Sequence, residues 1–259
     1  AMPIASITSH TSLPHPSTLV LHPDFAALEP FMRSLPQRMA NGEGTVIHKG
    51  RNELRIMEFE GRKLVVKAFR RPHLINQFVY GIFRASKAKR SYDNALLLQG
   101  LGIGTPQPVG YYNIRSVLGL RFDRSYFVTL QSDCTHRYEA LFEQHFSYEA
   151  DVLRAIGRLT AKLHENGLAH KDYGRANILF KQQPDGTIKL ELVDLNRMAV
   201  GPLDIQAGCK NFERLPATPQ MHRWMAETYA EARHFDAEEC FKLMEAFRAT
   251  QGGKIDGKY

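Results

Sequence analysis

Three polar side chains, Asp172, Asn177 and Asp194, are spaced along the chain in a way that suits phosphate chemistry. Asp194 follows two apolar runs that are separated by Asp185-Gly186. Because an Asp-Gly pair between two β-type runs is a hairpin signal, the chain should fold back and bring Asp194 beside Asn177. Phosphoryl transfer uses one carboxylate to orient the attacking hydroxyl, and an amide oxygen with a second carboxylate to hold Mg²⁺ on nucleotide phosphates. The three side chains supply these groups.

An ordinary structural interpretation competes with this one, because Asp and Asn are favoured in turns for their own sake. Each residue alone would fit that alternative, but three at this spacing, with a hairpin between them, favour a functional site. His164 and His170 could suggest a metal centre. No set of His, Cys or carboxylates at ligand spacing surrounds them, so we predict that His170 is structural.

Two short segments resemble motifs of protein kinases. Residues 170–177, HKDYGRAN, resemble the catalytic loop H-R-D-x-x-x-x-N, and residues 194–196, DLN, take the place of the metal-binding D-F-G. The loss of Phe and Gly after Asp194 is the larger departure, and it argues against a switch built on that phenylalanine. The resemblance implies an α+β, two-lobe, protein-kinase-like fold with a β-rich N-lobe and a small, mainly helical C-lobe.

A strand pattern upstream carries a candidate phosphate-binding lysine. Strands are predicted at 45–47, 54–59 and 63–69, and Lys67 lies between apolar neighbours in the last of them. A kinase-like fold places its phosphate-binding lysine on the third strand of the small lobe, as in V-A-I-K. A solvent-facing strand lysine is the alternative. The position of Lys67 upstream of the catalytic loop favours the functional interpretation.

The loop that would cover a nucleotide lies between the first two of these strands. Its sequence, His48 to Asn52, contains one glycine and no G-x-G-x-x-G motif. Backbone N–H groups of a shorter loop, together with a nearby cation, could still meet phosphates. Lys49, Gly50 and Arg51 are therefore candidate nucleotide-binding residues.

A helix is predicted for residues 86–102, ended by Gly100 and Gly102. Kinases use an acidic residue of this helix to orient the strand lysine, and Asp93 is the nearest candidate. Alignment with related kinases places their glutamate nearer Ser91, and positions two apart do not share a helix face. A Lys67–Asp93 ion pair is therefore a hypothesis.

Residues 70–90 contain many cationic residues and no Asp or Glu. Apolar residues lie among the cations at helical spacing. Two interpretations stay open. The apolar face could pack on the small lobe and leave the charges solvated, or the segment could contact an anionic membrane or an acidic substrate. Binding to nucleic acid is the weakest option, because the cluster lacks the interleaved aromatic residues of known modules.

The composition is that of an ordinary globular protein, with 259 residues of which 43% are hydrophobic. A net charge of +7 favours an anionic partner. Three widely spaced cysteines fit a reducing cytoplasm and argue against disulfides or structural zinc. No stretch is long and apolar enough for a transmembrane helix, and the first residues lack the features of a secretory signal.

The predicted organisation has three parts: a flexible segment at 1–22, an N-lobe at 23–131 and a C-lobe at 132–259. Helices are expected at about 24–39, 148–165, 206–215 and 218–250, the last of them broken near 234–236. No A-P-E motif of protein kinases is present. The C-lobe should therefore be small, without the usual peptide-docking helices.

Several segments together resemble the lipopolysaccharide kinase family, the Kdo and heptose kinases of the bacterial outer-membrane core: GRNELRI, VVKAFRRPHLIN, SKAKRSYDNA, GIGTPQPVGYY, HKDYGRANILF and LVDLNRM. The resemblance implies transfer of the ATP γ-phosphate to a sugar hydroxyl of the inner core, in the cytoplasm at the inner membrane. By the same resemblance, Asp172 would be the base, Asn177 and Asp194 the Mg²⁺ ligands, and Lys67 the phosphate lysine.

The implied cofactors are ATP and Mg²⁺, and the implied partner is an anionic glycolipid, bound by a monomer. Two alternatives stay open. One is a kinase-like phosphotransferase for a soluble small molecule or a protein. The other is a pseudokinase that binds nucleotide or membrane as a scaffold.

Overall fold

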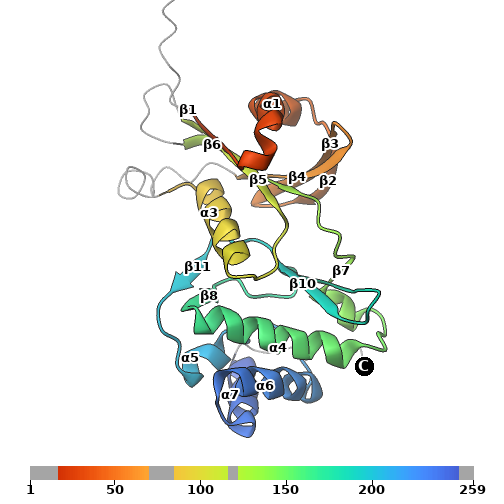
Figure 1. The fold of residues 1–259 in the computed structure, drawn as a ribbon, viewed down its shortest axis with the longest axis vertical. Helices are drawn as coiled ribbons and strands as arrows, with labels where there is room; N and C mark the ends of the chain where they lie inside the picture. The colour runs from red at the N-terminus through yellow and green to blue at the C-terminus, as the bar shows by residue number, and fades with distance from the viewer. Residues whose placement is uncertain (1–16, 70–84, 116–121, 251–259) are drawn as a thin grey trace, which may run out of the picture.

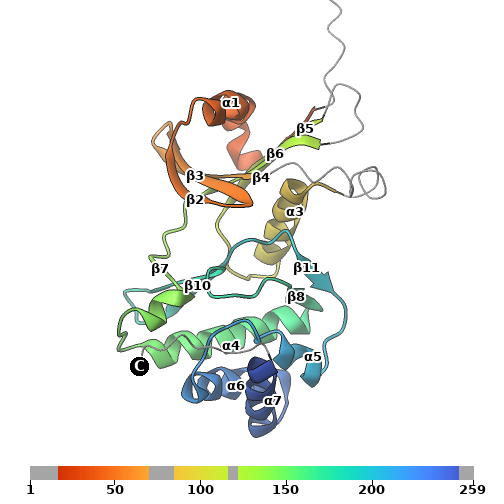
Figure 2. The same cartoon turned by 180° about the vertical axis from the view of Figure 1, so that it is seen from behind.

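A computed structural model describes residues 17–69, 85–115 and 122–250. These residues form two lobes, one above the other along the long axis of the molecule (Figures 1 and 2). The upper lobe is a β-sheet with one helix above it and one beside it, and the lower lobe is mainly helical. The predicted α+β, two-lobe organisation is confirmed.

The N-lobe sheet has six antiparallel strands in the order β1-β5-β6-β4-β3-β2. The strands are β1 (Ser17–Leu21), β2 (Thr45–Lys49), β3 (Asn52–Phe59), β4 (Arg62–Phe69), β5 (Pro108–Arg115) and β6 (Phe122–Leu130). Glu60 and Gly61, with φ of 49° and 72°, form the two-residue turn between β3 and β4. Positive φ at both positions is what such a hairpin turn requires.

One boundary of the predicted organisation is corrected by β1. The flexible segment was expected to reach residue 22, but residues 17–21 pair with β5, with Leu19 opposite Tyr112. The sequence STLVL is short, and its β-branched and leucine side chains suit a half-buried edge position. Pairing with a strand far along the chain, rather than any local signal, makes this segment ordered. The rest of the predicted flexible segment lies outside the described residues.

The N-terminal helices pack on one face of the sheet. They are η1 (Pro23–Leu28) and α1 (Glu29–Ala40), and non-helical backbone at Phe25, with φ −120° and ψ 20°, interrupts the first. Phe31, Met32 and Leu35 of α1 are fully buried against sheet residues such as Leu64 and Val128. The predicted helix is therefore present, in two parts.

On its other side the sheet meets α3 (Lys87–Gly100), which lies between the two lobes (Figures 1 and 2). The Ser86 hydroxyl accepts a hydrogen bond from the Lys89 backbone N–H at 3.0 Å and caps the helix start. Most of the predicted basic segment 70–90 lies outside the described residues, and its last residues form the start of α3.

Residues 131–135 connect the sheet to the C-lobe. The C-lobe elements are β7 (His136–Arg137), η3 (Tyr138–Phe142), α4 (Glu149–Glu165), β8 (Leu168–His170), β9 (Ile178–Gln182), β10 (Ile188–Leu192), β11 (Met198–Val200), α5 (Ile205–Lys210), α6 (Pro219–Arg233) and α7 (Ala237–Thr250). The strands form two small sheets, β10-β9-β7 and β11-β8. No helix in the described part of the chain combines the length and apolar character needed to cross a membrane.

Helix α4 forms the centre of the C-lobe and packs closely on α6. A Cβ at Gly157 would lie 2.4 Å from the Met225 carbonyl oxygen, so glycine is needed where the two helices touch. The predicted break after α6 is confirmed. His234 ends the helix with a φ of 55°, and the Asp236 carboxylate accepts a hydrogen bond from Glu239 N–H at 2.8 Å to begin α7.

Candidate active site

The β9–β10 hairpin forms as predicted and brings the two candidate metal ligands together. Ile178 lies opposite Leu192, and the ladder continues past the strands, because the Val193 N–H donates to the Asn177 carbonyl oxygen at 3.0 Å. Asp194 is the next residue. The hairpin therefore places Asp194 beside Asn177, through backbone bonds that do not depend on either side chain.

A buried histidine fixes the predicted catalytic loop, residues 170–177. The His170 ring accepts a hydrogen bond at Nδ1 from the Asp172 backbone N–H at 3.1 Å, and its Nε2 contacts the Val193 carbonyl oxygen at 2.9 Å. Burial lowers the pKa of His170, so the ring is neutral, with Nε2–H as the donor. His170 ties the loop of Asp172 to the strand end before Asp194. It is structural, as predicted.

The amide nitrogen of Asn177 is already used in a hydrogen bond within the loop. Nδ2 donates to the Asp172 carbonyl oxygen at 2.8 Å. The side-chain oxygen is then the atom free to act as a ligand. A hard amide oxygen beside a carboxylate is the donor set that Mg²⁺ prefers.

Asp194 has a backbone conformation that is unusual for a residue with a side chain, with φ at 60°. Non-glycine residues in this region are strained and are concentrated at functional sites. Its Oδ1 accepts hydrogen bonds at 2.6 Å from Lys67 Nζ and from Asn196 Nδ2. Burial alone would raise the pKa of the Asp194 carboxyl, but Lys67 and the two hydrogen bonds outweigh it and the pKa is lowered. The carboxylate is therefore ionised, and among the described residues Oδ2 accepts no hydrogen bond.

The structure does not form the hypothesised Lys67–Asp93 ion pair. Lys67, on β4, pairs with Asp194, whereas the Asp93 carboxylate pairs with Lys89 at 2.7 Å on the outer surface of α3. The reason is helix phase, since the side of α3 that faces the lower lobe carries the neighbouring residue, Asn94, and Arg90. These two donate to the backbone carbonyl oxygens of residues 195 and 196 at 2.6 and 3.0 Å. The helix thus holds the predicted metal-binding loop, residues 194–196, directly instead of orienting the lysine.

A cavity of about 470 Å³ lies between the lobes. Lys67, Asn177 and Asp194 line it, together with apolar side chains of the sheet and of β9. Four residues of the connection also line it: Gln131, Ser132, Cys134 and Thr135. An apolar slot beside exposed backbone, with cationic and oxygen groups at one end, is suited to a nucleotide. Asp172 lies at the edge of this arrangement, joined to Asn177 by the hydrogen bond described above.

The turn between β2 and β3 lies at the upper wall of this cavity. His48 and Asn52 line it, but Lys49, Gly50 and Arg51 do not. The charge of Arg51 still reaches the site region: together with burial, the first cause, it lowers the pKa of Lys87 at the start of α3. The assignment of residues 49–51 to phosphate binding stays a prediction.

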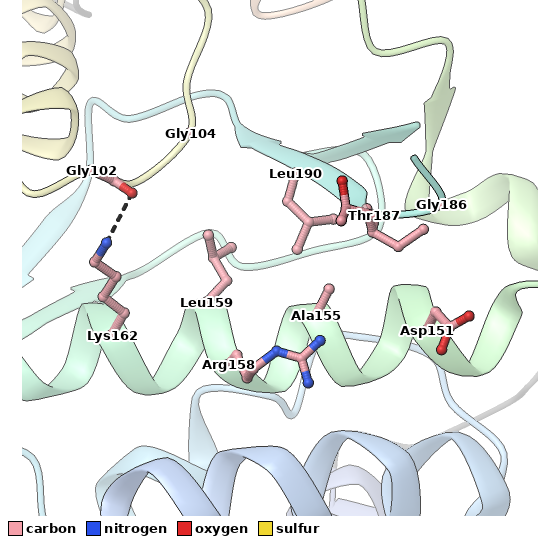
Figure 3. A pocket seen from close by; sticks show the side chains of 11 residues that line it. Gly102, Gly104, Asp151, Ala155, Arg158, Leu159, Lys162, Gly186, Thr187 and Leu190 are labelled. Carbon is pink, nitrogen blue, oxygen red and sulfur yellow. Dashed lines mark hydrogen bonds between the residues drawn. The ribbon is translucent and has the colours of Figure 1, made fainter. Parts of the chain in front are cut away.

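A second cavity, of about 490 Å³, lies between α4, the hairpin and the connection from α3 to β5 (Figure 3). None of the predicted site residues lines it. A Cβ at Gly104 would lie 2.0 Å from the Leu190 carbonyl oxygen, so the connection presses against β10. Gly104 accepts a hydrogen bond from Leu192 N–H, and the Thr105 hydroxyl donates to the Leu192 carbonyl oxygen, both at 2.8 Å. These bonds fix β10 just before Asp194.

A buried polar chain supports the catalytic loop from below, and sequence reasoning did not find it. Asn211 donates through Nδ2 to the His170 carbonyl oxygen at 2.9 Å and accepts at Oδ1 from His164 Nε2 at 3.0 Å. The other ring nitrogen of His164 accepts from the Tyr229 hydroxyl at 2.8 Å. The partners come from three distant segments, so no local spacing could have identified them.

The buried contacts of His164 with Asn211 and Tyr229 predict that the stability of the protein falls in acid. Burial lowers the pKa of His164 to about 4, from the 6.5 of an ordinary histidine. Below pH 6.5 His164 binds a proton in the unfolded chain but stays neutral in the folded chain. The stabilisation that depends on neutral His164 is therefore complete above pH 6.5 and is lost as the pH falls toward 4. At about 1.4 kcal/mol per pKa unit, we expect a loss of up to about 3 kcal/mol in the free energy of unfolding.

Urea denaturation of the wild type and of His164→Asn between pH 7.5 and 4.5 measures this contribution. The stability difference between the two proteins should shrink as the pH falls. His145→Gln, at an exposed position, is the matched control and should show a constant difference. A constant difference for His164→Asn as well would contradict the prediction.

Comparison with known proteins adds to this geometry. The model of the "Lipopolysaccharide kinase (Kdo/WaaP) family" matches residues 40–232. The chain belongs to this family. The resemblance seen in the sequence is thus confirmed, and family membership makes the protein a phosphotransferase of the kinase type.

One solved structure supports the fold, and a second is more distantly similar. One described as "WaaP in complex with acyl carrier protein" matches with a TM-score of 0.61 and 19% identity, covering 90% of this chain and 98% of that one. A Rio2 kinase–ADP/Mg²⁺–phosphoaspartate complex from Chaetomium thermophilum matches with a TM-score of 0.46 and 14% identity, covering 85% of this chain and 70% of that one. A search of curated proteins finds no match. The match to the WaaP structure shows that the two chains share a fold.

Proposed function

We propose that this member of the lipopolysaccharide kinase family transfers the γ-phosphate of Mg·ATP to a sugar hydroxyl of the lipopolysaccharide inner core, on Kdo or heptose. One observation carries the proposal. Lys67, Asn177 and Asp194 line the cavity between the lobes, and Asp172 adjoins them. These are the groups that phosphoryl transfer from a nucleotide requires.

Each residue has a distinct role in this proposal. The Asp172 carboxylate would accept a hydrogen bond from the acceptor hydroxyl and orient it for attack. Lys67 would release part of its contact with Asp194 to the phosphates, and Asn177 and Asp194 would hold Mg²⁺ through their oxygens. The metal would neutralise charge that develops on the transferred phosphoryl group.

The membrane side of the proposal rests on charge and family. The net charge of +7 suits an anionic acceptor, and the cytoplasmic face of the bacterial inner membrane is where such an acceptor would be presented. The basic segment 70–90 is the proposed contact with anionic lipid. Most of this segment lies outside the described residues, so the contact is proposed from sequence.

Transfer of ³²P from γ-labelled ATP tests the proposal. We expect Mg²⁺-dependent labelling of Kdo-lipid A in detergent micelles, and weaker labelling of the same core sugars after deacylation, because the acceptor is presented at a lipid surface. Casein and free sugars serve as soluble controls. Equal labelling of soluble acceptors would favour the soluble-substrate alternative. Binding of Mg·ATP without transfer to any acceptor would favour the scaffold alternative.

A further inference from the structure

The carboxylate of the candidate base is shared by two arginines from distant parts of the chain. Asp172 Oδ1 accepts hydrogen bonds from Arg197 Nη1 at 2.9 Å and from Arg214 Nη1 at 3.3 Å. Arg197 lies between the metal-binding loop and β11, and Arg214 lies after α5. Both contacts use the same oxygen, so one negative charge faces two positive ones at the place where the acceptor hydroxyl would bind.

The arginine side chains are open to solvent although the carboxylate is not. Arg197 and Arg214 are 55% and 53% exposed, and Asp172 is 23% exposed. A guanidinium has five N–H donors, and each arginine commits one of them to Asp172. Among the described residues, the remaining donors of these two exposed side chains form no hydrogen bond to the protein. Such a fork suits bidentate binding of a carboxylate or phosphate.

More positive charge lies directly beside this pair. A cavity of about 180 Å³ is lined by Arg214, Lys171 and Lys210, with Glu213 as its one acidic residue. Among the residues that the structure describes, neither lysine side chain forms an ion pair or a hydrogen bond. The surface next to Asp172 therefore carries an excess of cations, and none of them is needed to bind a nucleotide in the cavity between the lobes.

A purely structural role explains this arrangement poorly. The loop of Asp172 is already fixed through its backbone by His170 and Asn177. Two guanidinium donors on one oxygen also compete with the acceptor hydroxyl for the lone pairs of the base. The competition is removed when the arginines turn part of their donors to another anion.

We propose that Arg197 and Arg214, with Lys171 and Lys210 behind them, form the subsite for an anionic group of the acceptor, a carboxylate or phosphate close to the hydroxyl that is phosphorylated. The inference rests on the proposed function and deepens it, because it names the residues that would recognise the anionic group of the acceptor. The arginines are specificity-determining residues: they bind the acceptor anion and free Asp172 to orient the hydroxyl.

Steady-state kinetics of Arg197→Gln and Arg214→Gln test the subsite. We expect the acceptor KM to rise about tenfold or more in each variant, the size of one lost charged hydrogen bond, with kcat much less affected. The Kd of Mg·ATP should not change. Arg154→Gln, at a solvent-exposed ion pair of α4, is the matched control and should behave as wild type. A fall in kcat at unchanged acceptor KM would overturn the subsite and leave only a role in positioning Asp172.

Modified acceptors identify the anion. Wild-type enzyme should lose about tenfold in kcat/KM when the acceptor's carboxylates are converted to methyl esters, or when its phosphates are removed. The arginine variants should lose little further on the same modified acceptor. The modification that shows this non-additivity names the group that the arginines bind. Wild-type rates unchanged by both modifications would overturn the proposal.

The two proposals can fail separately. If the wild type binds Mg·ATP but phosphorylates no glycolipid, the proposed function fails. The subsite is then measured by calorimetric titration with free Kdo and with inorganic phosphate. Binding to the wild type that is lost in Arg197→Gln and Arg214→Gln supports it, and absence of wild-type binding rejects it.

Discussion

Replacing Asp172 with asparagine is expected to lower kcat by about 10²–10⁴-fold, the range that a general base typically supplies. The substitution removes the carboxylate that would orient the acceptor hydroxyl. It should leave the loop in place, because the bonds to His170 and Asn177 are made by the backbone N–H and carbonyl of residue 172. Labelled transfer at saturating substrate measures kcat, and calorimetry with Mg·ATP should show nearly unchanged affinity.

Asp151→Asn is the matched control for this experiment, since Asp151 is an exposed carboxylate in the first turn of α4 and away from the cavity between the lobes. It should retain wild-type turnover. Near-normal kcat in Asp172→Asn would show that another group orients the hydroxyl. Loss of Mg·ATP binding in that variant would show that the side chain supports the nucleotide site instead.

Replacing Asp194 with asparagine is expected to abolish Mg²⁺-dependent nucleotide binding. In the wild type, millimolar ATP with Mg²⁺ should raise the thermal midpoint by several degrees, because a ligand that binds the folded state stabilises it by mass action. The variant loses the anionic metal ligand and also the counter-charge of Lys67, whose side chain is only 12% exposed. The stabilisation should then vanish, and the protein without ligand should melt at a lower temperature.

Asp93→Asn gives the sharpest comparison. Asp93 was the predicted partner of Lys67, but it pairs with Lys89, and both side chains are nearly half exposed. An exposed pair of this kind contributes about 1 kcal/mol or less. Asp93→Asn should therefore keep the full thermal shift with Mg·ATP. If Asp93→Asn lost the shift and Asp194→Asn kept it, the roles assigned to the two carboxylates would be exchanged.

The sequence was sufficient for features that depend on neighbouring residues. The hairpin that joins Asn177 to Asp194 could be predicted because its Asp-Gly turn and flanking apolar runs are contiguous. Lys67 could be singled out because it lies among apolar residues of a predicted strand that resembles a kinase motif. The phase of a helix, which decides the face on which each residue lies, was the first feature that the sequence did not predict. Asp93 and Asn94 are adjacent in the sequence, yet one points to solvent and the other to the metal-binding loop. That difference is decided by which face of α3 meets the two lobes.

Contacts between distant segments were the second feature that the sequence did not predict. The pairing of β1 with β5, the support of His170 by Asn211, and the arginines on Asp172 each join parts of the chain that show no common pattern. Arg197 lies three residues after Asp194 and could have been noted as a cation near the site. Arg214 carried no such signal, because only the path of the chain through α5 brings it to the base.

The contacts of α3 with the metal-binding loop have a mechanical consequence for the two lobes. The lobes are joined covalently by residues 131–135 on one side and through Arg90 and Asn94 on the other (Figures 1 and 2). Two attachments define an axis, so the easiest relative motion is a rotation about the line between them. Lys67 and Asp194 lie beside one attachment and would move little, whereas the tip of the β2–β3 turn would swing farthest. A nucleotide could therefore enter and leave through this rotation while Lys67 and Asp194 stay close to each other.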